Sequence, residues 1–417
     1  MQTHNDTPGH TTGKRSPLVV IFITIFIDLV GFGIVIPVLP LYAKEFHASE
    51  TVIGLLLGVF SAMQFVFAPL LGKLSDRVGR RPVLLFSLIG TAIGFLIMGL
   101  ANALWMLFLG RIIDGITGGN ISTAQAYIAD VTPAEERSRG MGLIGAAFGL
   151  GFIVGPAIGG AMSYISPAAP FYFAAALAAV NATALYFLLP ESLTAESRTA
   201  QSRPSILRMI SETGGWQLRA VVATYFFATV SFAMLTATFA LFTNRKFGFD
   251  ATHNGYLFAY LGLLGAIIQG GLIGRLVKIF GDKSLAVTGI ALLAAGMFLM
   301  PSSETLTTLM LVNTVIAIGN SLATPTLNGI ASKSVDSAHQ GSVLGVMASS
   351  ASLARIIGPA MGGFLLSRDP DQIYGRTPYW TGAAIMLVAL AVAATLSATS
   401  EIVESGSVIE ERSGEGT

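Results

Sequence analysis

The chain has 417 residues, of which 53% are hydrophobic and only 11% are charged, and its mean hydropathy is +0.70. A soluble chain of this length would carry roughly twice that share of charge, so the composition indicates a membrane protein. The formal net charge of +1 excludes a large basic face and, with it, nucleic acid as a partner. The absence of cysteine excludes disulfides, thiolate metal sites and cysteine nucleophiles.

Twelve apolar runs follow one another along the chain, each long enough to cross ~30 Å of hydrocarbon as a helix of about 20 residues. The runs are continuous rather than alternating, which favours helices over strands. Residues 1–17 are polar and hold no signal-peptide core, so we expect the first run to stay in the mature protein. The predicted helices span 18–43, 51–73, 82–101, 104–129, 140–164, 170–190, 218–242, 255–277, 284–301, 305–331, 341–366 and 379–400.

The basic residues predict the orientation of these helices. Seventeen of the 24 Lys and Arg residues fall on the side of the N-terminus and five on the other, while Arg111 and Arg355 lie within helices. Because Lys and Arg accumulate in cytoplasmic loops, we expect both termini to be cytoplasmic. The predicted organisation is a cytoplasmic N-tail (1–17), a six-helix half (18–190), a cytoplasmic linker (191–217), a second six-helix half (218–400) and a cytoplasmic tail (401–417).

The two halves repeat each other at an offset of 200 to 203 residues. The Gly-Asn pair at 119–120 recurs at 319–320, and the Gly-Pro-containing segment 155–160 recurs at 358–363. A parallel duplication of six helices is typical of transporters and places the substrate site near the bilayer midplane, between the halves.

A basic segment with two glycines, 72–81, connects the second and third predicted helices, and a weaker copy lies at 274–283. The glycines permit a tight turn, and the basic residues hold the segment at the anionic cytoplasmic surface. The simpler interpretation is a basic turn that only fixes topology.

Asp28 lies ten residues into the first predicted helix, about 15 Å along it and near the bilayer centre. It is the only acidic residue that we place so deep. A lone carboxylate at this depth is a proton carrier by default. The alternative is a structural partner for Arg111 or for the Asn groups of the tenth helix.

Arg111 and Asp114 stand three residues apart inside the fourth predicted helix. An arginine there is costly unless it is paired or hydrated. The spacing puts both side chains on one face, so a local ion pair that stiffens the helix is possible.

Small residues recur about every fourth position in the fifth predicted helix. Such spacing lets two helices approach closely, and a proline kinks the helix. The physics supports ordinary packing and an exchanger motif equally well. The residues are Gly145, Gly149, Gly151, Gly155, Pro156 and Gly160.

Together, the 72–81 segment, the Arg111–Gly115 segment and the glycine motif resemble the major facilitator superfamily. Within it, the chain is most similar to the drug/proton antiporters, in particular the tetracycline efflux proteins, over nearly its whole length. The resemblance implies an all-α membrane protein with twelve transmembrane helices in two six-helix halves, the major facilitator fold. The glycine motif is typical of antiporters in this family.

The resemblance also implies roles for single residues. Asp76 would meet the start of the eleventh helix near Gly341, where the helix dipole favours an anion, and Arg77 or Arg80 would pair with Asp130. Proton coupling would involve Asp28, Arg111 and Asp114. The gate residues so implied are Gly72, Asp76, Arg77, Gly79, Arg80, Arg81 and Asp130.

The chain departs from the tetracycline carriers in two places. Those carriers have further acids in the third and ninth helices, whereas the matching stretches here, 91–95 and 293–296, contain none. In the family these acids handle a cationic metal–tetracycline chelate. Their absence argues against tetracycline itself as the substrate.

Polar and aromatic side chains occur on the helices that we expect to line a central cavity. Apolar walls with a few hydrogen-bonding groups suit an amphipathic organic ligand. The candidates are Phe32, Gln64, Asn120, Gln125, Phe148, Tyr225, Tyr256, Gln269 and Asn320.

We therefore expect a monomeric inner-membrane transporter that exports small amphipathic organic compounds in exchange for protons. The sequence has no phosphate-binding loop and no clustered metal-ligand set, so we expect no cofactor, no metal and no enzymatic activity. One alternative is proton-coupled uptake of a small organic nutrient or anion, with Arg111 holding a substrate carboxylate. Another is a non-transporting membrane sensor or a membrane enzyme.

Overall fold

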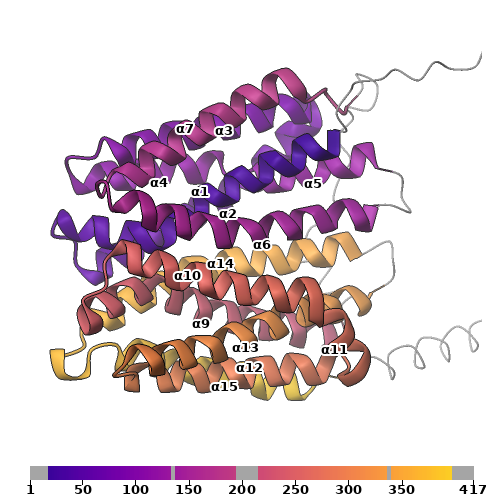
Figure 1. Cartoon of the computed structure of the whole chain (residues 1–417). Coiled ribbons are helices and arrows are strands. Elements are labelled where there is room, and N and C mark those ends of the chain that lie inside the picture. The colour runs from indigo at the N-terminus through magenta and orange to yellow at the C-terminus, as the bar shows by residue number, and fades with distance from the viewer. Residues whose placement is uncertain (1–16, 133–136, 194–214, 336–339, 397–417) are drawn as a thin grey trace, which may run out of the picture.

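The computed structural model describes residues 17–132, 137–193, 215–335 and 340–396, and every regular element in these ranges is a helix (Figure 1). The first half contains α1 (Pro17–Glu45), α2 (Glu50–Val78), α3 (Arg80–Gly99), α4 (Leu104–Thr117), α5 (Asn120–Val131), α6 (Arg137–Ser163) and α7 (Ala169–Leu188). The second half contains α9 (Trp216–Phe247), α10 (Ala251–Ile267), the π-helical turn η3 (Ile268–Leu272), α11 (Ile273–Phe280), α12 (Asp282–Leu299), η4 (Met300–Ser302), α13 (Leu306–Lys333), α14 (Gln340–Leu366), η5 (Asp371–Ile373) and α15 (Arg376–Ala394). Most of the predicted linker and both predicted tails lie outside the described residues.

Eleven helical segments of the described chain are long and apolar enough to cross a membrane. At 14 and 12 residues, α4 and α5 are each too short, but they follow one another directly and together have the length of a twelfth crossing. The prediction of an all-α, twelve-helix protein is confirmed, and the chain is a multi-pass membrane protein.

The two halves lie side by side, with α1–α7 on one side of the molecule and α9–α15 on the other (Figure 1). Each half has its own buried apolar core, built around Leu39 and Phe171 in the first half and around Phe239 and Tyr379 in the second. Contact between the halves runs mainly through two helix pairs, α2 against α14 and α6 against α10. These four helices therefore border any space between the halves.

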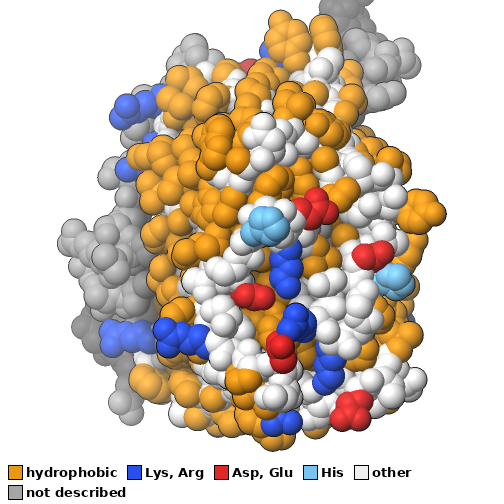
Figure 2. All heavy atoms as spheres, turned by 90° about the vertical axis from the view of Figure 1, so that its left-hand side faces the viewer, with side chains coloured by type: hydrophobic (Ala, Val, Ile, Leu, Met, Phe, Trp, Pro, Cys, Tyr) orange, Lys and Arg blue, Asp and Glu red, His pale blue; other side chains and the backbone are white. Residues whose placement is uncertain are grey.

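The ends of the bundle differ. We call the end where α7 finishes and α9 begins the linker end, and the other the opposite end. Figure 2 views the opposite end, where basic, acidic and histidine side chains are interspersed. Arg245 pairs there with Asp371, and Lys44 lies 3.7 Å from Glu50. Interspersed, paired charges of this kind suit a surface at the water boundary of a bilayer.

The basic 72–81 segment is mostly helical. α2 continues to Val78 and α3 starts at Arg80, so Gly79 alone makes the turn, with φ 111°. Gly281 does the same between α11 and α12, with φ 76°. Left-handed backbone of this kind favours glycine, so the predicted tight turn exists but is shorter than the sequence indicated.

Two predicted helices are interrupted. The run at 104–129 breaks at Gly118 and Gly119, between α4 and α5. The run at 255–277 passes through η3, which contains Gly270 and Gly271. Paired glycines weaken a helix without changing its apolar pattern, which explains why both runs read as continuous.

Candidate functional site

A cavity of about 150 Å³ lies between the halves. Its charged groups are Asp28 of α1, Asp114 of α4 and Arg355 of α14. Among the described residues that line it, Arg355 alone comes from the second half. The first half therefore forms almost the whole wall of the cavity, and the second half contributes a single arginine.

Asp28 is partly exposed to this cavity, while its neighbour Leu29 is buried. The Asn120 side chain, at the start of α5, hydrogen-bonds to the Asp28 carboxyl, and the Asp114 carboxyl is close enough to interact with it electrostatically. The side chain that contacts Asp28 is Asn120 of α5, which is neither of the partners considered from the sequence, Arg111 and the Asn groups of the tenth helix.

Arg111 is only 2% exposed, and its charge is compensated within the first half. Its Nη1 lies 3.1 Å from Asp114 Oδ2, and its guanidinium carbon stands 4.1 Å from the centre of the Phe60 ring. The hydroxyl of Thr91 donates to the other oxygen of Asp114 at 3.0 Å. The local pair considered from the i, i+3 spacing is present, while Arg111 Nε has no hydrogen-bond partner among the described residues, and Arg111 is not one of the residues that line the cavity.

The break between α4 and α5 borders the same cavity. Gln64 Nε2 donates to the Gly118 carbonyl at 2.9 Å, and this carbonyl lies at the end of α4. A helix end leaves carbonyl groups without intrahelical partners, and Gln64 of α2 supplies a hydrogen-bond donor to one of them. The break is thus a stabilised feature of the site.

The structure brings four of the nine predicted cavity residues together: Phe32, Gln64, Asn120 and Phe148 line the cavity. The other five do not line it. Gln125 and Gln269 are exposed, and Tyr256 is 59% exposed. Tyr225 packs against the core of the second half and lies near Arg355, and Asn320 accepts a hydrogen bond from Thr324.

The glycine motif of α6 is divided between two partners. Gly151 and Gly155 pack against α1, where Gly33 faces Gly155 and Pro156. Gly160 packs instead against Gly255 of α10, in the other half. Gly145 and Gly149, nearer the linker end, have open space where a Cβ would stand. Close packing of the motif is therefore limited to its second part.

The two halves meet near the opposite end. An added Cβ at Gly255 would lie 2.5 Å from the Pro156 carbonyl oxygen, and one at Gly58 would lie 3.1 Å from that of Ile356. Thr51 and Ser367, one from each half, share a hydrogen bond of 2.8 Å. This end of the molecule is closed.

Toward the linker end the same helices separate. Glycines on α2, α6, α11 and α14 there have no heavy atom within 4 Å of an added Cβ, beyond their own helix and chain neighbours. They are Gly72, Gly142, Gly145, Gly274, Gly341 and Gly345. The structure therefore holds a state open toward the linker end.

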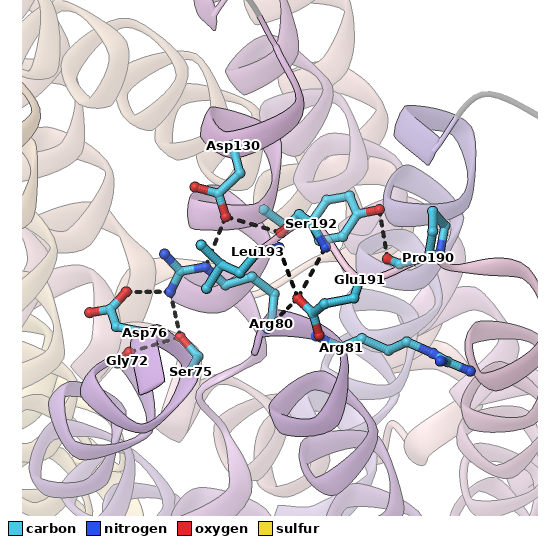
Figure 3. A network of polar contacts seen from close by, with 11 residues as sticks. Gly72, Ser75, Asp76, Arg80, Arg81, Asp130, Pro190, Glu191, Ser192 and Leu193 are labelled. Atoms are coloured by element: carbon cyan, nitrogen blue, oxygen red, sulfur yellow. Dashed lines mark hydrogen bonds and ion pairs between the residues drawn. The ribbon is translucent and has the colours of Figure 1, made fainter. Parts of the chain in front are cut away.

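A polar network lies at the linker end of the first half (Figure 3). Arg80 is at its centre and is only 6% exposed. Its Nη1 lies 2.5 Å from Asp76 Oδ1 and 2.7 Å from Ser75 Oγ, and its Nε donates to Asp130 Oδ2 at 3.0 Å. Of the two arginines expected as partners of Asp130, Arg80 forms the ion pair, and Arg77 is exposed.

The residues that complete this network were not predicted. Glu191, placed in the linker, accepts from the backbone N–H of Arg80 at 2.8 Å and of Arg81 at 3.2 Å, at the start of α3. Ser192 donates to Asp130 at 3.0 Å. One feature of the sequence could have indicated the Glu191 contact: this carboxylate follows the sixth predicted helix directly, on the same side of the membrane as the start of the third. Backbone N–H groups at the start of a helix favour an anion.

Two further predicted gate contacts can be placed. Arg81 donates to the Tyr186 carbonyl and lies 5.1 Å from the centre of the Tyr186 ring. The contact between Asp76 and the first turn of the eleventh helix needs a closed linker end, since Gly341 stands in open space here. It stays a prediction.

The second half repeats the central ion pair with its charges exchanged. Arg80 and Asp282 each begin the helix after a glycine turn, and Asp130 and Lys333 each lie at the end of the partner helix. Lys333 Nζ lies 2.5 Å from Asp282 Oδ2, and Asp282 is 5% exposed. The ion pair thus has the same position in both halves, but the basic and the acidic residue have exchanged places.

Comparison with known proteins gives consistent results. The family model of the major facilitator superfamily matches residues 21–278 and 221–412. The tetracycline resistance protein of class D from Salmonella ordonez is 35% identical over 381 residues, which cover 91% of this chain and 96% of the relative. Multidrug resistance protein 2 of Bacillus subtilis (strain 168) is 30% identical over 390 residues, covering 90% and 94%.

Among solved structures, a bacterial homologue of the human lysosomal transporter Spinster, in an inward-facing and unoccupied conformation, superposes with a TM-score of 0.76. It is 15% identical, and the match covers 90% of this chain and 95% of that one, so it supports the fold. The chain belongs to the major facilitator superfamily, within the group that includes the tetracycline and multidrug resistance proteins.

Proposed function

We propose that this protein is a proton-coupled secondary transporter that exports small amphipathic organic compounds by alternating access. The observation that carries the proposal is Asp28, a carboxyl group partly exposed in a cavity between two halves that meet at only one end. Relatives named tetracycline and multidrug resistance proteins support the class of cargo. We further propose that it acts as a monomer and performs no catalysis.

The proposed orientation places the linker end in the cytoplasm and the chain in the inner membrane. The described state is then open to the cytoplasm, where Asp28 releases its proton and the cavity accepts a compound. Closure at the linker end and opening at the opposite end would expose the same carboxyl group to protons from outside. Because Asp114 interacts with Asp28, and Arg111 neutralises Asp114, we propose that both tune this exchange.

The gate in this proposal is the network around Arg80. Its ion pairs tie the end of α2 to the ends of α3 and α5, so these helices move as one unit when the linker end closes. The α6 glycine motif would let α6 stay packed on α1 during this movement, through Gly151 and Gly155.

The test is a flux assay in proteoliposomes that contain a pH-sensitive dye. Compounds that raise the melting temperature of the purified protein are added outside, and the direction of proton movement is recorded. Export by antiport requires protons to move against the compound, whereas the alternative of proton-coupled uptake requires protons to move with it. In Asp28→Asn we expect compound-driven proton movement to be lost while the melting temperature is kept, because the substitution removes a charge that is costly within a membrane-spanning helix. Proton movement at the parent rate in this variant would refute the role of Asp28.

A further inference from the structure

Arg111 of α4 and Arg355 of α14 both lie away from the ends of their helices, and they differ in how their charge is compensated. Arg111 has a carboxylate partner and an aromatic ring against its guanidinium. Arg355 of α14 has neither among the described residues. Within the described part of the chain, its guanidinium makes one hydrogen bond, from Nη2 to Ser352 Oγ at 3.2 Å on its own helix.

No carboxylate of the described residues pairs with Arg355. Tyr225 of α9 lies near it, but a phenol is a neutral group at ordinary pH. A cationic side chain within a membrane-spanning segment is costly unless it pairs or faces water, and such residues mark substrate or ion pathways. Arg355 faces the cavity, so an anionic group in the cavity would complete its coordination.

The wall across the cavity carries the complementary charge. Asp28 lies on α1 and Arg355 on α14, so the two groups belong to different halves. The rest of the lining is largely apolar and includes Phe32, Phe148 and Phe152. Asp114, the other carboxyl group of the lining, is already paired with Arg111, so the cavity offers the Asp28 carboxyl group, the Arg355 guanidinium and aromatic walls.

Size further defines the cargo. At about 150 Å³ the cavity is smaller than the roughly 300–1,000 Å³ of typical small-molecule sites. A cavity of this size holds the charged groups of a molecule rather than the whole of it.

We propose that the cargo is amphoteric: a small aromatic or aliphatic compound with an acidic group that binds Arg355 and a basic group that binds Asp28. This inference rests on the proposed function and specifies its substrate class. The basic group competes with the proton for Asp28, as antiport requires, while the acidic group supplies the missing partner of Arg355. Binding of one molecule by groups from both halves also couples its presence to their relative movement.

The experiment uses two matched sets of probes that differ in the distance between charges. One set is 3-(1-naphthyl)alanine, its methyl ester and its N-acetyl derivative. The other is 4′-(aminomethyl)biphenyl-4-carboxylic acid with the same two modifications. In each set the parent compound has both charges, the ester only the positive one and the N-acetyl compound only the negative one. Affinities are measured on the purified full-length protein in nanodiscs.

We expect at least one amphoteric probe to bind about tenfold or more tightly than its ester, as a charge-assisted hydrogen bond predicts. Arg355→Gln should reduce its affinity to that of the ester and leave the ester unchanged, which also shows that the variant is folded. Arg355→Lys should retain part of the preference. The control is Arg368→Gln, because Arg368 is an exposed arginine just beyond the end of α14 that stacks on Phe364; it should keep the parent affinities.

Three results would overturn the inference: amphoteric probes that bind no better than their esters, an unchanged preference in Arg355→Gln, or equal losses for ester and amphoteric probe in that variant. The proposed function is judged separately. If an ester moves protons against its own flux in the parent and in Arg355→Gln, proton-coupled export stands while the amphoteric cargo does not.

Discussion

Replacing Gly255 by alanine should shift the transporter away from the state described here. At this position α10 meets α6 near the opposite end, and an added Cβ would lie 2.5 Å from the Pro156 carbonyl oxygen and 2.7 Å from the Gly160 Cα. Both are backbone atoms, so no side chain can rotate away. Ordinary contact begins near 3.4 Å, so the two helices must separate by roughly 0.7–0.9 Å.

The free-energy cost follows from the packing. Overpacking of a well-packed interface costs about 1–3 kcal/mol. This cost falls on the state in which the opposite end is closed and is relieved when that end opens. A bias of this size changes the ratio of two states by about five- to 150-fold.

The chain has no native cysteine, so spin labels can be introduced without background. One label pair, at Asn102 and Glu304, reports the distance between the halves at the opposite end. A second pair, at Lys73 and Lys278, reports the distance between the halves at the linker end. All four positions are exposed. We expect Gly255→Ala to lengthen the first distance and shorten the second. Gly274→Ala is the control, because Gly274 lies farther along the same span with open space around it. Distance distributions equal to those of the parent in a folded Gly255→Ala protein would refute the reasoning.

The remaining predictions concern the cavity and the gate. Arg111→Ala should lower stability by about 3–5 kcal/mol, because breaking a buried ion pair leaves Asp114 unpaired, and it should impair flux more than Asp28→Asn does. Arg111→Lys should recover only part of the stability and flux. An unchanged melting temperature and pH profile in the Ala variant would contradict both expectations. Gln64→Leu should cost about 1–3 kcal/mol in thermal or denaturant unfolding, since the Gly118 carbonyl loses its donor; parent-like stability would show that water replaces the amide. Asp76→Asn should weaken the charge–dipole contact expected in the closed linker end by about 1 kcal/mol and so raise the open population at the Lys73–Lys278 label pair, and an unchanged distribution would rule that contact out.

The sequence predicted the parts of this molecule that depend on local pattern. Continuous apolar runs located the helices, because each must satisfy its own backbone hydrogen bonds in lipid. The spacing of Arg111 and Asp114 indicated a possible pair, because residues three apart share a helix face. A family resemblance was needed to associate Arg80 with Asp130, which are 50 residues apart.

Features that depend on tertiary contact escaped prediction. The break at Gly118 is stabilised by Gln64 from another helix, and Glu191 meets Arg80 across 111 positions of sequence. Arg355 was noted only as an arginine within a helix, since its lack of a carboxylate partner is visible only once all neighbouring helices are in place. Sequence patterns identify such residues but not what lies opposite them.

The break between α4 and α5 has a mechanical consequence. Because it frees α5 from the helix that carries Arg111, α5 is a separate rigid rod, with Asn120 beside Asp28 at one end and Asp130 at the other. These two ends are ten residues apart, about 15 Å along the helix. One short helix therefore joins the side chain beside Asp28 to the ion-pair partner of Arg80, with no break between them. In the second half the matching helix, α13, runs unbroken from Leu306 to Lys333, so the residues that correspond to α4 and α5 are there part of one helix.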